Sequence, residues 1–116
     1  MYCFPKDATL HSLTPHMHLR GRWMKFEMLT PDGKRHMLCS VPRYDFNWQQ
    51  TYVLEKPLQI RAGTWILLTG GYDNSPRNPA NPDPAKAITW GQQSWDEMFL
   101  GWCNVAWSKD NSFAVK

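Results

Sequence analysis

Hydrophobic and polar residues alternate with a period of two from Thr9 to His18, the pattern of a strand that buries one face. Further along the chain, aromatic and β-branched residues concentrate in short segments between turn signals. Together they predict strands over residues 9–18, 23–29, 35–41, 49–54, 65–72 and 95–107. Turn residues such as Pro31-Asp32-Gly33 and Ala62-Gly63 separate them, and helical periodicity is hard to find. We therefore expect an all-β fold, an antiparallel β-sandwich of jelly-roll type.

The length of 116 residues is typical of one domain, so residues 1–116 are predicted to form a single β-sandwich. Segment 74–84 holds four prolines, which excludes a helix or a central strand. Its Asn and Asp residues offer oxygen ligands, but without the regular carboxylate spacing of a calcium loop. An ordered surface loop is the favoured interpretation, with asparagines bonded to their own backbone.

The composition excludes several functions. A net charge of +3 with scattered Lys and Arg argues against a nucleic-acid partner, and no apolar stretch approaches the ~20 residues of a membrane helix. No secretory signal is recognisable after Met1. Three cysteines allow at most one internal disulfide. Of the seven tryptophans, several of those within 95–107 are expected in the core, which weakens a role in stacking on carbohydrate or single strands.

The most informative residues are His16 and His18. In an extended strand they lie on one face, about 6.6 to 6.8 Å apart along the chain, while Met17 points to the other face. Two imidazoles so placed can approach one metal ion to ~2.0 Å. The competing interpretation is a pair of ordinary surface histidines.

Other candidate ligands are weaker. His11 is out of phase with His16 on a regular strand, and His36 follows a hairpin turn among charged residues, where an exposed position is expected. Met98 follows two carboxylates, and from its residue type alone core packing is the better prediction.

A family resemblance changes the interpretation of Met98. The segment His16-Met17-His18-Leu19-Arg20-Gly21 resembles the His-x-His-x-x-Gly segment of the peptide-amidating and dopamine-hydroxylating copper monooxygenases, and Asp96-Glu97-Met98 resembles their Glu-Met. The similarity runs over residues 7–107. It implies a copper site made of His16, His18 and Met98 in the C-terminal, catalytic-copper domain of an ascorbate-dependent type II copper monooxygenase. Imidazoles with a soft thioether suit copper better than zinc.

The chain also departs from that family. The domain that binds the second copper through three histidines is missing from it. Thr14 and Trp102 stand where the peptide-amidating enzymes have a substrate-binding Arg and Tyr, which puts a peptide carboxylate substrate in doubt. Phe99 replaces a cysteine of the animal enzymes. A distant, bacterial branch fits these differences.

The expected function is the oxygen-activating half of a copper monooxygenase, which would use O2, an external reductant and a second copper domain or larger assembly. A periplasmic or extracellular location goes with it. The alternatives are a non-catalytic copper-binding or structural module, and a sandwich that binds no metal. Segment 41–48 is expected to be an aromatic-rich loop, with a substrate cleft as the less favoured interpretation.

Overall fold

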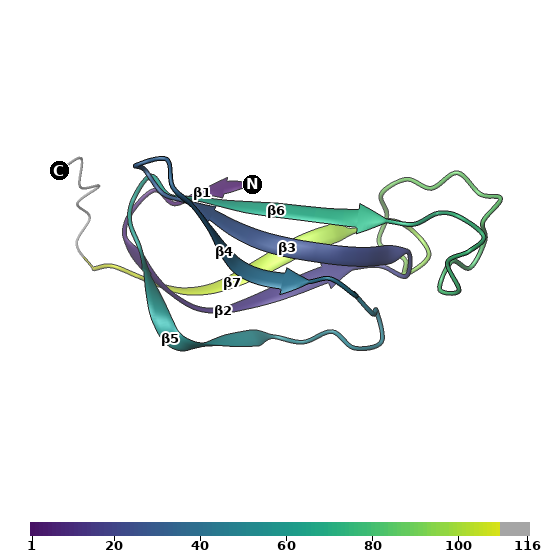
Figure 1. The fold of residues 1–116 in the computed structure, drawn as a ribbon, viewed down its shortest axis with the longest axis horizontal. Helices are drawn as coiled ribbons and strands as arrows, with labels where there is room; N and C mark the ends of the chain where they lie inside the picture. The colour runs from purple at the N-terminus through teal and green to yellow at the C-terminus, as the bar shows by residue number, and fades with distance from the viewer. Residues whose placement is uncertain (110–116) are drawn as a thin grey trace.

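The computed structural model describes residues 1–109, and within them the chain forms seven strands and no helix (Figure 1). The strands are β1 (Tyr2–Cys3), β2 (Ala8–Met17), β3 (Gly21–Leu29), β4 (Arg35–Val41), β5 (Tyr52–Ile60), β6 (Trp65–Tyr72) and β7 (Phe99–Trp107). The predicted all-β class is confirmed.

The strands form two antiparallel sheets. One has the order β1-β6-β3-β4 and the other β5-β2-β7. Leu10, Leu13 and Met17 of β2 share one buried cluster with Met24 and Phe26 of β3, so the core lies between the two central strands. All five side chains are fully buried. The result is a sandwich-like arrangement of two sheets over one hydrophobic core.

The strands predicted at 35–41 and 65–72 agree with β4 and β6. Elsewhere the boundaries were wrong. β5 begins later than predicted and continues through Pro57, which is tolerated because β5 is an edge strand and needs no N–H there. Likewise β7 begins only at Phe99, because the residues before it belong to a loop.

The prediction that several tryptophans are buried was also wrong. All seven are at least 38% exposed, while Leu, Met, Phe and Ile side chains fill the core. On β7 the alternation explains this: Trp102 faces outward, and its neighbours Gly101 and Cys103 face the other sheet. A Cβ at Gly101 would lie 2.2 Å from Leu68, so the sheets approach too closely there for a larger residue.

β2 is irregular near its middle. A β-bulge lies between Leu10 and Ser12, and as a consequence Leu10 and Leu13 both face the core although they are three residues apart. The phase argument that placed His11 across the sheet from His16 therefore does not apply. His11 is still no partner for His16, because five residues of strand separate them by roughly 16 Å.

The longest connection lies at one end of the molecule. The segment between β6 and β7 forms a large loop there, beside the turn that joins β2 to β3 (Figure 1). Two of its asparagines bond to nearby backbone, as predicted: Asn78 donates to the carbonyl of Asp73, and Asn81 donates to that of Ser75. Asn74 instead donates to the carboxylate of Glu97.

Two partly buried groups make the fold sensitive to alkali. Burial raises the pKa of the Cys103 thiol from 9.0 to about 11, and burial with the nearby Glu97 charge raises the pKa of the Tyr72 hydroxyl from 10.0 to about 12. In both cases the folded chain favours the neutral form of the group. The stabilisation is therefore complete below the group's ordinary pKa, and it is lost as the pH rises through the raised pKa of the folded chain.

We expect the free energy of unfolding, measured by urea denaturation, to fall between pH 9 and pH 11. A Cys103→Ala variant should fall less steeply, because the thiol that resists ionisation is gone. A Cys3→Ala variant is the control and should fall like the wild type. Equal slopes for Cys103→Ala and wild type would contradict the assignment.

Candidate metal site

The two histidines of the His-x-His segment lie together at the end of β2. His16 is half-buried and His18 only 5% exposed. Their ring centroids are 5.1 Å apart and their planes cross at 89°. Two imidazoles bound to one tetrahedral ion at ~2.0 Å have centroids roughly 5 Å apart. The spacing is therefore that of two rings able to share a metal ion, and Met17 between them is fully buried on the other face, as predicted.

The Nδ1 atom of His16 is fixed by a side-chain amide. It lies 2.6 Å from Oε1 of Gln49, and the Nε2 of that amide donates to the carbonyl of Phe46 at 2.9 Å. The second bond orients the amide, so its oxygen faces the imidazole. An oxygen can only accept, and Nδ1 of His16 must therefore carry the hydrogen. Its Nε2 keeps a free lone pair.

His18 has the same arrangement with a different partner. Its Nδ1 lies 3.2 Å from the carbonyl oxygen of Asp96, 78 residues further along the chain. That carbonyl also makes Nδ1 the donor and leaves the lone pair on Nε2. Metal-binding histidines in proteins are held in this way, with one ring nitrogen donating to a carbonyl or carboxylate and the other facing the ion.

The backbone between the histidines is held on both sides. On one side Met17 pairs with Phe99 of β7. On the other, β5 has already diverged, and the buried Tyr44 takes its place: its hydroxyl accepts from the N–H of Met17 at 3.0 Å and donates to the carbonyl at 2.8 Å. Burial raises the pKa of Tyr44, so this hydroxyl keeps its proton. The His-x-His segment is thus a rigid platform.

Met98 comes immediately before β7. His16 pairs with Leu100 and Met17 with Phe99, and the same register continued by one residue sets Met98 opposite His18. Residues opposite each other in antiparallel strands face the same side of the sheet. The hydroxyl of Tyr72 donates to the backbone carbonyl of Met98 and so fixes its position. Met98 is half-buried instead of being a core residue. Its role as the sulfur ligand stays a prediction.

Arg20 forms hydrogen bonds that hold the loop between β6 and β7 next to the histidines. Its side chain is fully buried and donates through Nε to Oδ1 of Asn81 at 2.9 Å, and through its Nη atoms to the carbonyls of Trp95 and Asp83. Trp95 immediately precedes Asp96, the residue whose carbonyl holds His18. A buried guanidinium therefore sets the position of the loop that orients one of the two histidines.

Aromatic rings surround the pair. Trp102 lies 5.4 Å from His16 between ring centroids, and Phe46 lies 6.1 Å from His18 at a nearly perpendicular angle. Both rings limit how the imidazoles can turn and exclude water from part of their surface.

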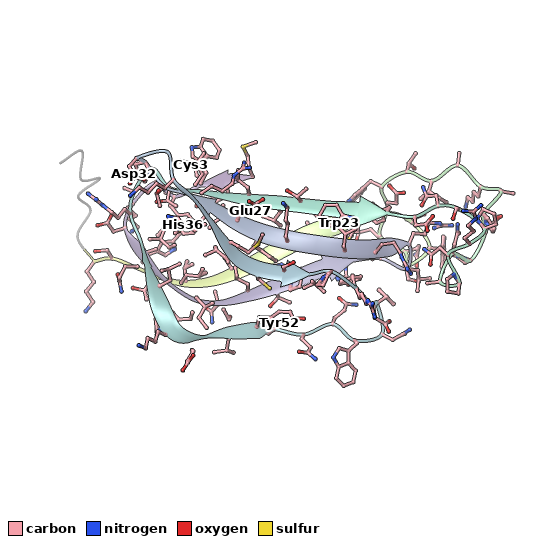
Figure 2. All side chains as sticks on the ribbon, in the orientation of Figure 1. Cys3, Trp23, Glu27, Asp32, His36 and Tyr52 are labelled. Atoms are coloured by element: carbon pink, nitrogen blue, oxygen red, sulfur yellow. The ribbon has the colours of Figure 1, made fainter. Side chains whose placement is uncertain are left out.

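The remaining histidines lie elsewhere. His36 is exposed at the start of β4, and Figure 2 shows it with Asp32 and Cys3 at the end of the molecule opposite the large loop. This agrees with its predicted exposed position. Within residues 1–109 no group of three His, Cys, Asp or Glu side chains is placed to hold a metal ion. Any site at His16 and His18 therefore has a thioether or another donor as its third ligand.

Three residues important to this region were not found from the sequence: Gln49, Tyr44 and Arg20. The two side chains from the connection between β4 and β5 act across 27 and 33 residues of sequence, a relation that no local pattern reveals. Arg20 alone carried a signal, because it lies within the His16-to-Gly21 segment on which the family resemblance rests.

Comparisons with protein-family models, with curated proteins and with solved structures gave no match to this chain. In the part of the chain that the structure describes, no helix is long and apolar enough to cross a membrane.

The acceptor beside His16 gives a test of the site. Gln49→Leu removes the oxygen that fixes the Nδ1 hydrogen, so we expect copper affinity to fall by about 10- to 100-fold. Competition with a chromophoric copper chelator measures this. The control is Gln50→Leu at the neighbouring exposed position, which should bind like the wild type. Equal affinities for all three proteins would show that Gln49 does not orient a ligand.

Proposed function

We propose that His16, His18 and Met98 hold one copper ion, which would make the chain a copper-binding all-β domain. The observation that carries the proposal is the matched pair of hydrogen bonds at Nδ1 of the two histidines. Both rings have their other nitrogen free, and their centroid spacing suits a shared ion.

More specifically, we propose that the domain is the oxygen-activating half of an ascorbate-dependent type II copper monooxygenase, of a bacterial branch. The two sequence segments that resemble that family, His16 to Gly21 and Asp96 to Met98, are the two segments that meet here through the bond from His18 to Asp96. A jelly-roll topology belongs to the same proposal. It is supported by the connections between strands, of which only that from β3 to β4 stays within one sheet.

The residues would divide the work of such a site. Copper would supply reversible one-electron chemistry and a place for O2. His16 and His18 would bind it through neutral Nε2 atoms, while Gln49 and the carbonyl of Asp96 hold the rings in place. The thioether of Met98 would favour the reduced ion, because soft sulfur ligands select Cu(I).

The proposal includes what the domain needs from outside: O2, an external reductant and a second copper domain or larger assembly for the other electron. A periplasmic or extracellular location is part of it. The second candidate function is a copper-binding module without catalysis. Trp102 favours it, because its ring lies against His16 where the peptide-amidating enzymes place a substrate-binding tyrosine.

Copper titration tests the proposed ligands first. Anaerobic titration with Cu(I) should show one ion bound per chain, and Met98→Ala should weaken that binding by about tenfold or more while changing Cu(II) binding less. The matched control is Met37→Ala, at an exposed methionine on β4. Binding with the same affinity in Met98→Ala and Met37→Ala would remove the sulfur from the site.

Oxygen consumption by the copper-loaded chain with ascorbate then distinguishes the two classes. Uptake of O2 above that of free copper, and its loss in Met98→Ala, supports the monooxygenase half. Stoichiometric copper binding without oxygen uptake, also after addition of an electron-donating partner domain, supports the non-catalytic module.

A further inference from the structure

A second feature at the loop end of the molecule is a cleft that the copper site does not use. It encloses about 490 Å³ between the turn from β2 to β3, the start of the β4–β5 connection and the loop that follows β6. The residues that matter for its chemistry are Leu19, Arg22, Arg43, Phe46, Pro79 and Ala80. This volume is within the range of small-molecule sites in proteins.

Two cationic side chains and one acid line the cleft. Arg22 and Arg43 are both exposed, and within residues 1–109 neither forms an ion pair. Arg22 makes one bond at 3.4 Å, to Oδ1 of Asn78, and the carboxylate of Asp73 lies near enough to balance part of its charge. The acid that lines the cleft, Asp45, accepts from the N–H of Asn47 through Oδ1 and so faces its own turn. Two guanidinium groups therefore have most of their N–H donors available.

Much of the remaining lining is apolar. Leu19, Phe46, Pro79 and Ala80 supply hydrocarbon surface, whereas Tyr44, Asp45 and Asn47 add polar atoms. Guanidinium groups recognise carboxylates and phosphates through paired N–H donors, whereas the apolar walls favour a hydrophobic body. The ligand that satisfies both is an organic acid with one carboxylate and an apolar remainder.

The cleft is adjacent to the histidines. The ring of Phe46, which lines the cleft, packs edge-on against His18, and Leu19 directly follows His18 in the chain. A molecule held in this cleft would therefore lie beside Phe46, the ring that packs against one of the two proposed imidazole ligands.

We propose that this cleft binds the carboxylate end of a small organic acid with an apolar body, using Arg22 and Arg43 as anionic anchors. The substrate role of this ligand rests on the proposed copper function, whereas its binding does not. The experiment therefore begins with the copper-free chain.

The probes are phenylacetate, the neutral phenylacetamide and inorganic phosphate, titrated while amide chemical shifts are followed by NMR. Phenylacetate should shift the amides of Gly21, Phe46 and Ala80 in a saturable way, and phenylacetamide should bind at least about tenfold more weakly. Arg22→Gln and Arg43→Gln should each weaken phenylacetate binding by about tenfold. Arg61→Gln, at an exposed arginine outside the cleft, should not.

The proposal is overturned if phenylacetate causes no saturable shifts at these amides, if the amide binds as well as the acid, or if the Arg43→Gln variant binds like Arg61→Gln. Phosphate binding that is tighter than that of phenylacetate would overturn the apolar half of the specificity.

A second measurement tests the substrate role. Phenylacetate should change the electron paramagnetic resonance spectrum of the copper-loaded chain, and this change should be absent in Arg43→Gln. Binding to the copper-free chain without any change at copper would overturn the anchor role alone. Failure to bind copper would overturn the proposed function, and the titration of the copper-free cleft would still stand.

Discussion

A His16→Ala/His18→Ala double variant will bind copper at least about a thousandfold more weakly than the wild type, a loss of about 4 kcal/mol. The reason is that both Nε2 atoms disappear. His11 lies roughly 16 Å from His16 along the strand, and His36 lies at the opposite end of the molecule, so neither can replace them. Titration with a competing chelator measures the affinity. His18 is only 5% exposed, so circular dichroism of both proteins must show the same β-sheet signal before the affinities are compared.

The control for this experiment is His11→Ala/His36→Ala, which also removes two histidines but neither of the proposed pair. It should bind copper like the wild type. Equal copper uptake by the two double variants would show that the chain binds metal elsewhere, or through its surface in general, and only the two-sheet architecture would survive.

Arg20→Met will lower the free energy of unfolding by about 3 kcal/mol or more. Methionine fills a similar volume, but it leaves the side-chain oxygen of Asn81 and the carbonyls of Trp95 and Asp83 without their donor. Because these acceptors tie the long loop to the end of β2, hydrogen exchange of that loop should also become faster. Urea denaturation measures the first effect and mass spectrometry of exchanged peptides the second.

An exposed arginine gives the comparison. Arg43→Met should change the free energy of unfolding by less than about 0.5 kcal/mol, as most surface substitutions do. If Arg20→Met destabilises the chain no more than Arg43→Met, the buried guanidinium does not hold the loop. Copper affinity should also fall in Arg20→Met, because the carbonyl of Asp96 loses its fixed position against His18.

The sequence was informative where a residue acts within one strand. The placement of His16 and His18 on one face, and of Met17 on the other, needs only the period of an extended chain, and the structure has it. The turn at Gly33 was also predicted from local residues, because Pro and Gly are typical of tight turns. The structure gives Gly33 a φ of 84°, which suits glycine.

Relations between distant segments could not be predicted in this way. The hydroxyl of Tyr44 replaces a missing strand beside Met17, and the amide of Gln49 sets the hydrogen of His16. Neither contact produces a periodic pattern in the sequence, since each depends on the path of the connection between β4 and β5. The β-bulge at His11 was invisible too, because an extra residue looks like any other until the partner strand is known.

The pairing of β2 with β7 has a consequence for the order of events during folding. His18 directly follows β2, and the carbonyl of Asp96 that holds its ring lies 78 residues later, in the loop just before β7. Contacts so far apart close late, after most of the chain has been synthesised. A copper ion bound as proposed would therefore find all three donors only after Met98 has been synthesised and β7 has paired with β2. Its binding would then stabilise that pairing.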